Sequence, residues 1–160
     1  MKTWLSILIV VSSIAFLLGR QPFLRTGAAS YTPQTRNFTI ITVPVLTKEL
    51  RPIYPFLSRD FAQGGVLQGK EVYRFQPETL TVYQGDTINI VFVNPEDDAH
   101  TFVLPAFHVA LALPAQATTT THFVASSTGI FLFICDISSH VPYMAGSLVV
   151  LPDNDARPSP

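Results

Sequence analysis

Two sulfur-containing side chains lie near the end of the chain, with a histidine between them. The chain of 160 residues has one cysteine, Cys135, and its only methionine besides Met1 is Met144. His140 lies between them and gives the spacing Cys-x4-His-x3-Met. Sulfur ligands suit copper or zinc, whereas magnesium and calcium prefer oxygen ligands. The spacing therefore indicates a metal site, and a methionine among its ligands favours copper.

A copper site of this kind needs a second imidazole, because two histidines and a thiolate form its trigonal plane and a methionine binds weakly as the axial ligand. His100 fits because it follows an acidic turn directly after a predicted strand. Loops that follow strands gather at the ends of a β-sandwich. Zinc is disfavoured, since closed zinc sites take several cysteine and histidine ligands. We therefore predict one copper ion, Cu(I) or Cu(II), bound by His100, Cys135, His140 and Met144.

Each predicted ligand also has a purely structural interpretation. A lone cysteine is often a small buried hydrophobe, and a methionine often fills a gap in a core. His140 alone reads as an ordinary loop histidine, and His100 is supported by the expected fold rather than by local spacing. We expect structural roles for the two remaining histidines, His108 in an apolar run and His122 inside a predicted strand.

The segments that must position these ligands are short and rich in Val, Ile, Thr and Phe. Turn-forming sequences separate most of them, and thirteen prolines disfavour a helical bundle. This pattern predicts an all-β fold, an antiparallel β-sandwich of Greek-key type. The predicted strands cover residues 38–46, 71–75, 79–82, 87–94, 118–125, 129–135 and 146–151.

Local features refine two of these segments. Pro44 cannot donate a ladder hydrogen bond, so we place it at a sheet edge or a strand end. In residues 87–94, Ile88, Ile90 and Phe92 share one face of the strand. We expect one short helix near residues 57–62, within the irregular stretch 47–69.

The N-terminal residues predict an export or anchoring segment. Residues 1–19 carry Lys2 and then an apolar stretch of about fifteen residues, which is typical of a signal peptide and slightly short of a membrane-spanning helix. We expect a hydrophobic helix that is either cleaved or kept as a membrane anchor, and a periplasmic or other extracytoplasmic location. Residues 20–36 are the predicted linker, 37–152 the folded domain and 153–160 a disordered tail.

Composition excludes some classes of function. The formal net charge is −1, and no cluster of Lys and Arg accompanies aromatic residues, so we expect no nucleic-acid partner. A single cysteine excludes an internal disulfide, although the N-terminus predicts export. The lone thiol therefore needs another role, which the metal site supplies.

The segment 71–151 resembles a cupredoxin, or blue copper, domain. The resemblance rests on the Pro-x-x-Leu-x-Val-x-x-Gly-Asp-x-Ile stretch at 77–88, the Asn-x5-His-x-Phe stretch at 94–102, and the loop 135–144. The ligand spacing after the cysteine is like that of azurins. The surroundings of His100, in the sequence His-Thr-Phe-Val-Leu-Pro, are similar to the copper domain of cytochrome c oxidase subunit II and nitrous oxide reductase.

The resemblance implies a mononuclear copper site. The subunit II-like relatives bind a dinuclear copper centre through two thiolates four residues apart, but position 139, four residues after Cys135, is serine. A second bridging thiolate is therefore missing. By resemblance, the expected function is transfer of single electrons between redox proteins such as a cytochrome or a terminal oxidase.

Other functions remain open at this point. The chain could be a copper chaperone that delivers copper to a respiratory oxidase, a subunit II-like accessory domain, or a metal-free interaction domain. A copper nitrite reductase or multicopper oxidase needs more histidines than the four present, and Ile134 and Asp136 flank Cys135 where such enzymes carry histidine. We therefore expect an electron carrier rather than an enzyme.

Residues around the ligands have predicted supporting roles. Asn94 and either Ser138 or Ser139 are candidates to orient the ligands by hydrogen bonding. The apolar residues that follow His140, at positions 141–143, form a predicted docking patch through which electrons leave.

Overall fold

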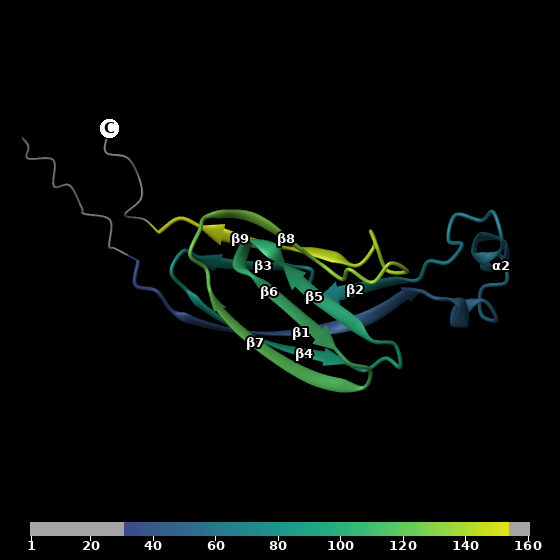
Figure 1. The fold of residues 1–160 in the computed structure, drawn as a ribbon, viewed down its shortest axis with the longest axis horizontal. Helices are drawn as coiled ribbons and strands as arrows, with labels where there is room; N and C mark the ends of the chain where they lie inside the picture. The colour runs from purple at the N-terminus through teal and green to yellow at the C-terminus, as the bar shows by residue number, and fades with distance from the viewer. Residues whose placement is uncertain (1–30, 154–160) are drawn as a thin grey trace, which may run out of the picture.

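The computed structural model describes residues 31–153 and shows two β-sheets packed face to face (Figure 1). One sheet has the strand order β2-β1-β4-β7 and the other the order β3-β9-β8-β5-β6. The predicted all-β sandwich is confirmed. The strands are β1 (Thr35–Leu46), β2 (Val72–Gln76), β3 (Thr79–Tyr83), β4 (Thr87–Asn94), β5 (His100–Leu104), β6 (Val109–Leu113), β7 (Ala117–Val124), β8 (Gly129–Ile134) and β9 (Ala145–Leu151). The helical turns are η1 (Lys48–Leu50), α2 (Leu57–Phe61) and η2 (Pro105–Phe107).

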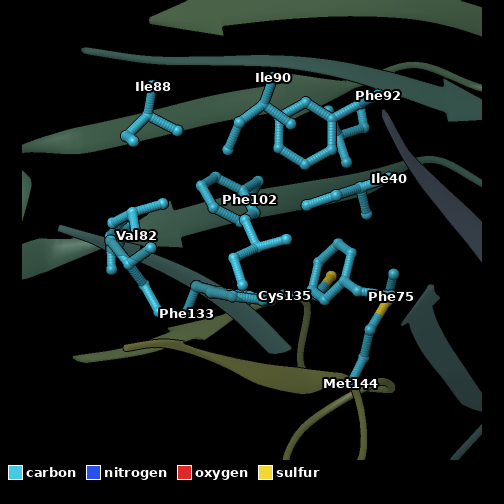
Figure 2. Close-up of a cluster of buried hydrophobic side chains, with 14 of the residues drawn as sticks. Ile40, Phe75, Val82, Ile88, Ile90, Phe92, Phe102, Phe133, Cys135 and Met144 are labelled. Atoms are coloured by element: carbon cyan, nitrogen blue, oxygen red, sulfur yellow. The ribbon is translucent and has the colours of Figure 1, made fainter. Parts of the chain in front are cut away.

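Alternation along the strands builds the core between the sheets. Ile88, Ile90 and Phe92 of β4 are at most 1% exposed, as the shared face predicted. Four phenylalanines from both sheets meet with ring centroids 4.7–5.8 Å apart. Figure 2 shows this cluster, and Cys135 and Met144 belong to the same core. The four rings are Phe75, Phe92, Phe102 and Phe133.

The sheets are mixed, which corrects the prediction of an antiparallel sandwich. β1 pairs with β4 in parallel, and β3 pairs with β9 in parallel. Successive strands such as β3 and β4 lie in different sheets, so β1 pairs with β4 and β3 pairs with β9, which are distant in sequence. Short-range pattern carries no information on the direction of such partners.

Pro44 lies where β1 has a partner on one side. β1 pairs with β4 over residues 35–41 and with β2 over residues 41–46, with an irregularity between Pro44 and Leu46. The strand is internal to its sheet, yet its second half runs along a local edge. Pro44 therefore lies at a local sheet edge, as predicted, although β1 as a whole is an internal strand of its sheet.

Several predicted boundaries shift. β1 begins at Thr35, inside the predicted linker, and the short helix near 57–62 is present as α2. β5 and β6 were not predicted as strands, and Pro105 interrupts the apolar sequence between them. The predicted hydrophobic helix at 1–19 and nearly all of the tail at 153–160 lie outside the described residues. Within residues 31–153, no helix is long and apolar enough to cross a bilayer.

A buried carboxylate fastens β1 to the turn between β3 and β4. Asp86 accepts hydrogen bonds from the Tyr31 hydroxyl (2.5 Å), the backbone N–H groups of Gln34 and Tyr83 (2.7 and 3.0 Å) and the Arg36 guanidinium (3.0 Å). Burial alone would raise the pKa of Asp86, but these hydrogen bonds outweigh it and lower the pKa to about 2. The ionised carboxylate therefore stabilises the fold.

We predict that Asp86→Asn lowers the free energy of unfolding by about 2 kcal/mol at pH 7, since hydrogen bonds to a buried charge are lost. The unfolded carboxyl has a pKa of about 3.8, above that of the folded state. The stabilisation is therefore complete above pH 4 and is lost as the pH falls toward 2. Urea unfolding of both proteins between pH 7 and pH 2 measures this.

The matched control is Glu78→Gln, which removes an exposed carboxylate 3.8 Å from Arg74. Exposed ion pairs contribute little, so this change is expected to cost less than about 1 kcal/mol. A stability gap between wild type and Asp86→Asn that stays constant down to pH 2 would contradict the assignment.

Candidate metal centre

Three buried donor side chains meet at one end of the sandwich. The ligand atoms of His100, Cys135 and His140 all lie within 4.8 Å of one another. His100 is the first residue of β5, Cys135 directly follows β8, and His140 lies in the loop that leads to β9. The sequence placed His100 in a loop, and the structure places it at the start of a strand. The three residues predicted to share a metal are therefore brought together.

Backbone hydrogen bonds shape the loop that carries two of these donors. The Cys135 N–H donates to the Met144 carbonyl (2.9 Å) and closes the base of the loop. Within it, His140 N–H donates to Ile137 O (2.9 Å) and Met144 N–H to His140 O (3.1 Å), which forms helical turns. These hydrogen bonds connect residues three and four positions apart, which accounts for the short spacing between Cys135, His140 and Met144.

The distances fit one shared ion. His100 Nδ1 lies 3.3 Å from His140 Nδ1, and Cys135 Sγ lies 3.5 Å from His140 Nδ1. Ligand bonds of 2.0–2.3 Å at tetrahedral or trigonal angles separate donor atoms by about 3.3–4.0 Å. The donor set of one thiol and two imidazoles is the set copper takes in trigonal sites. The residues present therefore fit a copper ion.

Burial keeps both imidazoles neutral. Burial, and to a smaller extent the charge of His140, lower the pKa of His100 to about 4, while the charge of Asp98 opposes the shift. Burial also lowers the pKa of His140, against the opposing charges of Glu71 and Asp98. Neutral imidazoles have a free lone pair for a metal at pH 7. His100 Nε2 is buried and has no hydrogen-bond partner among the described residues. Buried polar atoms without a partner are uncommon in protein cores.

Thr101 supports the sulfur from β5. Its backbone N–H donates to Cys135 Sγ (3.4 Å). Its hydroxyl accepts from the Asp136 N–H (3.0 Å) and lies 2.6 Å from Asp136 Oδ1 but 3.5 Å from the sulfur. The single hydroxyl proton therefore belongs with the carboxylate. Sequence reasoning missed Thr101, although a polar residue directly after a predicted ligand is a usable signal.

Tyr73 packs against both histidines and was also missed. Its ring lies 4.7 Å from the His100 ring and 4.8 Å from the His140 ring, centroid to centroid. Its hydroxyl donates to Asp98 Oδ2 (2.6 Å). Tyr73 is distant in sequence from each ligand, so local spacing holds no signal for it.

Asn94 holds the turn before His100, as the sequence suggested. Its amide donates to Asp98 O (2.8 Å) and Pro114 O (3.0 Å), and its oxygen accepts from the Thr42 hydroxyl (2.7 Å). Ser138 and Ser139 act differently, because their carbonyl oxygens accept bonds from the segment before β2. Of the three candidates, the side chain of Asn94 is the one that positions the site.

Met144 lies in the core beside this loop and is 1% exposed. With Cys135 it lines an apolar pocket of about 250 Å³. Its axial role stays a prediction. His108 adopts a left-handed backbone conformation (φ 55°) after η2, and His122 of β7 pairs with Asn89, so both lie outside the donor cluster.

Comparisons with known proteins agree with this geometry. No curated protein sequence matches significantly. Similar solved structures include a copper nitrite reductase (15% identity, TM-score 0.54) and a blue copper oxidase (18%, 0.55), both from Nitrosomonas europaea, and the multicopper oxidase mgLAC (18%, 0.54). They cover 78%, 79% and 78% of this chain but only 45%, 41% and 40% of their own chains. This chain thus spans less than half the length of these proteins, and the similarity at such identities is one of fold.

A sequence-family model described as the cupredoxin-like domain matches residues 69–150, which is just over half of the chain. The match includes every predicted copper ligand and eight of the nine described strands. With the two-sheet sandwich and the His-Cys-His cluster, it shows that the chain belongs to the cupredoxin-like domain family.

Proposed function

We propose that this chain is a mononuclear type 1, or blue, copper protein that passes single electrons between redox partners outside the cytoplasm. The observation that carries the proposal is the convergence of His100, Cys135 and His140 within 4.8 Å, all buried. Membership of the cupredoxin-like family supports it.

The protein's own residues hold the donors in one arrangement. Copper supplies the one-electron couple when bound. The neutral imidazoles of His100 and His140 and the sulfur of Cys135 would hold it, and Thr101 N–H donates to the sulfur. Tyr73 packs against both imidazole rings. A cage fixed by its surroundings rearranges little on electron transfer, which suits a carrier.

One ion and no catalytic centre are the simplest assignment. The chain has one cysteine, and a second cluster of three donors is absent from residues 31–153. The similar copper enzymes are more than twice as long as the part that this chain matches. These points favour a carrier over an enzyme.

Partners and location complete the proposal. The predicted export or anchor segment at 1–19 supports a periplasmic or other extracytoplasmic site, with attachment to the membrane if the segment is kept. The partner is a redox protein such as a cytochrome or a terminal oxidase. A copper chaperone or an accessory domain of an oxidase is the alternative.

The decisive test is the colour of the protein with copper. Addition of Cu(II) to the full chain is expected to give an intense visible absorption that saturates at one equivalent and is bleached by ascorbate. Cys135→Ser is expected to abolish the band, because the absorption requires the thiolate. His140→Ala is expected to weaken or lose it, whereas His122→Ala, outside the cluster, leaves it intact.

Other outcomes separate the alternatives. Tight binding of Cu(I) without colour in the Cu(II) form would favour the chaperone. A folded protein that binds neither ion would be a metal-free domain and would refute the proposal.

Met144→Leu tests the axial ligand. Loss of the weak thioether removes a donor that stabilises Cu(II), so the reduction potential is expected to rise while one copper stays bound. Voltammetry and copper analysis of the blue protein measure this. Unchanged potential and spectrum would assign Met144 to core packing alone.

Val141→Asp tests the docking patch. Val141 and Tyr143 are 37% and 42% exposed beside His140. A charge there is expected to slow electron self-exchange between reduced and oxidised protein by about tenfold at low salt, since two like charges must approach. Val91→Asp on β4, where Val91 is 36% exposed, is the matched control. Equal rates in the two variants would place the exit route elsewhere.

A further inference from the structure

The connection between β1 and β2 is attached to the loop that carries His140. This insert, residues 47–71, contains η1 and α2 and projects beyond the end of the sandwich where β8 turns into β9 (Figure 1). The last residues of the insert bond the backbone of this loop. Glu71 N–H donates to Ser139 O (3.0 Å), and Lys70 Nζ donates to Ser138 O (2.6 Å).

A cleft of about 290 Å³ lies between the insert and this loop. Its lining residues include Lys48, Arg51, Lys70, Glu71 and Ser139. Lys48 Nζ lies 3.3 Å from a Glu71 carboxylate oxygen. The lining therefore carries three cations and one anion, which is a local excess of positive charge.

Two of the cations have no carboxylate partner. Arg51 donates to the Lys48 carbonyl (3.1 Å) and lies over the Phe61 ring (5.6 Å from its centroid). Lys70 bonds a carbonyl oxygen of the loop. Among the described residues, neither has a carboxylate within ion-pair distance. Carboxylates of another molecule could form ion pairs with both Arg51 and Lys70. The planar guanidinium of Arg51 is well suited to bind a carboxylate through two hydrogen bonds.

The same insert exposes large apolar side chains. Ile53 is 66% exposed, Phe56 is 70% exposed, and Tyr54 lies near Phe56 with ring centroids 6.1 Å apart. Exposed aromatic side chains beside charges are typical of protein interfaces. The cleft reaches Ser139, the residue before His140, and the charge of Glu71 already acts on the His140 ring. A partner docked here is therefore next to the ligand from which electrons leave.

We infer that the insert and its cleft form the docking site for an acidic redox protein, whose carboxylates pair with Arg51 and Lys70. The acidic turn Glu96–Asp98 lies between β4 and β5 and does not line the cleft. The positive lining of the cleft therefore directs an acidic partner to the insert rather than to this turn. The inference rests on the proposed function and specifies the class of partner.

The test uses small redox reagents of opposite charge on the reduced blue protein. Ferricyanide takes one electron from Cu(I), which gives Cu(II) and ferrocyanide, and stopped-flow absorption at the blue band follows the reaction. At low ionic strength, Arg51→Glu is expected to slow ferricyanide about tenfold and to accelerate a tris-phenanthroline cobalt(III) cation. Arg51→Gln is expected to give rates between those of the wild type and Arg51→Glu. Added salt is expected to remove the differences in rate between the three proteins.

Arg74→Glu is the matched control, because it makes the same change of charge at an exposed residue of β2 that does not line the cleft. It is expected to change the ferricyanide rate less than about twofold. Equal slowing by Arg51→Glu and Arg74→Glu in proteins that keep their blue band would overturn the docking inference and leave the proposed function intact. Absence of the blue band from wild type loaded with Cu(II) would refute both the docking inference and the proposed function.

A competition experiment identifies the ligand as a carboxylate-bearing chain. An oligoglutamate peptide is expected to inhibit oxidation of the wild type by ferricyanide and to lose this effect in Arg51→Glu. Inorganic phosphate at equal ionic strength is expected to inhibit much less. Equal inhibition by phosphate would indicate a small-anion site and contradict a protein partner.

Discussion

The donor cluster depends on one contact between two strands. β5 and β8 pair only through Val103 opposite Ile134. Continued by antiparallel register, this pair places Phe102 opposite Cys135 and Thr101 opposite Asp136, and the hydrogen bonds between Thr101 and Asp136 show that the register continues. The sulfur is thereby fixed against the start of β5, where His100 lies. A slip of one residue would turn His100 and Cys135 to opposite faces.

Packing of the hydrophobic core offsets the unfavourable free energy of burying this donor cluster. Burial of two imidazoles is unfavourable, and His100 Nε2 has no hydrogen-bond partner among the described residues. The phenylalanines beneath the site compensate by burying large apolar surfaces, each worth about 1.5–3 kcal/mol. Phe102 contacts Phe133, the residue two before Cys135, so the same packing that stabilises the sandwich orients the strand ends that carry the ligands.

The sequence predicts the site better than it predicts the sheets. The spacing of Cys135, His140 and Met144 reflects helical turns within one loop, so it is visible locally. Thr101 is missing from the prediction because its contacts depend on how β5 is paired with β8, and Tyr73 because its contacts depend on how β2 packs against the other sheet. The parallel pairs β1–β4 and β3–β9 also depend on strand pairing that local sequence does not reveal. The stretch 47–69 was predicted as irregular apart from one short helix, and its contacts with the loop that carries His140 were not predicted.

Position 139 links the chemistry of the site to its surface. In the dinuclear relatives that the sequence resembles, this position supplies a second thiolate. Here Ser139 lines the cleft, and its carbonyl is bonded by Glu71. The loop is thus held from inside by Cys135 N–H on Met144 O and from outside by the insert. The insert contacts this loop through the backbone carbonyl of Ser139, and its cations line the cleft that reaches Ser139. Serine at position 139 therefore lies in the lining of the cleft that we propose as the docking site.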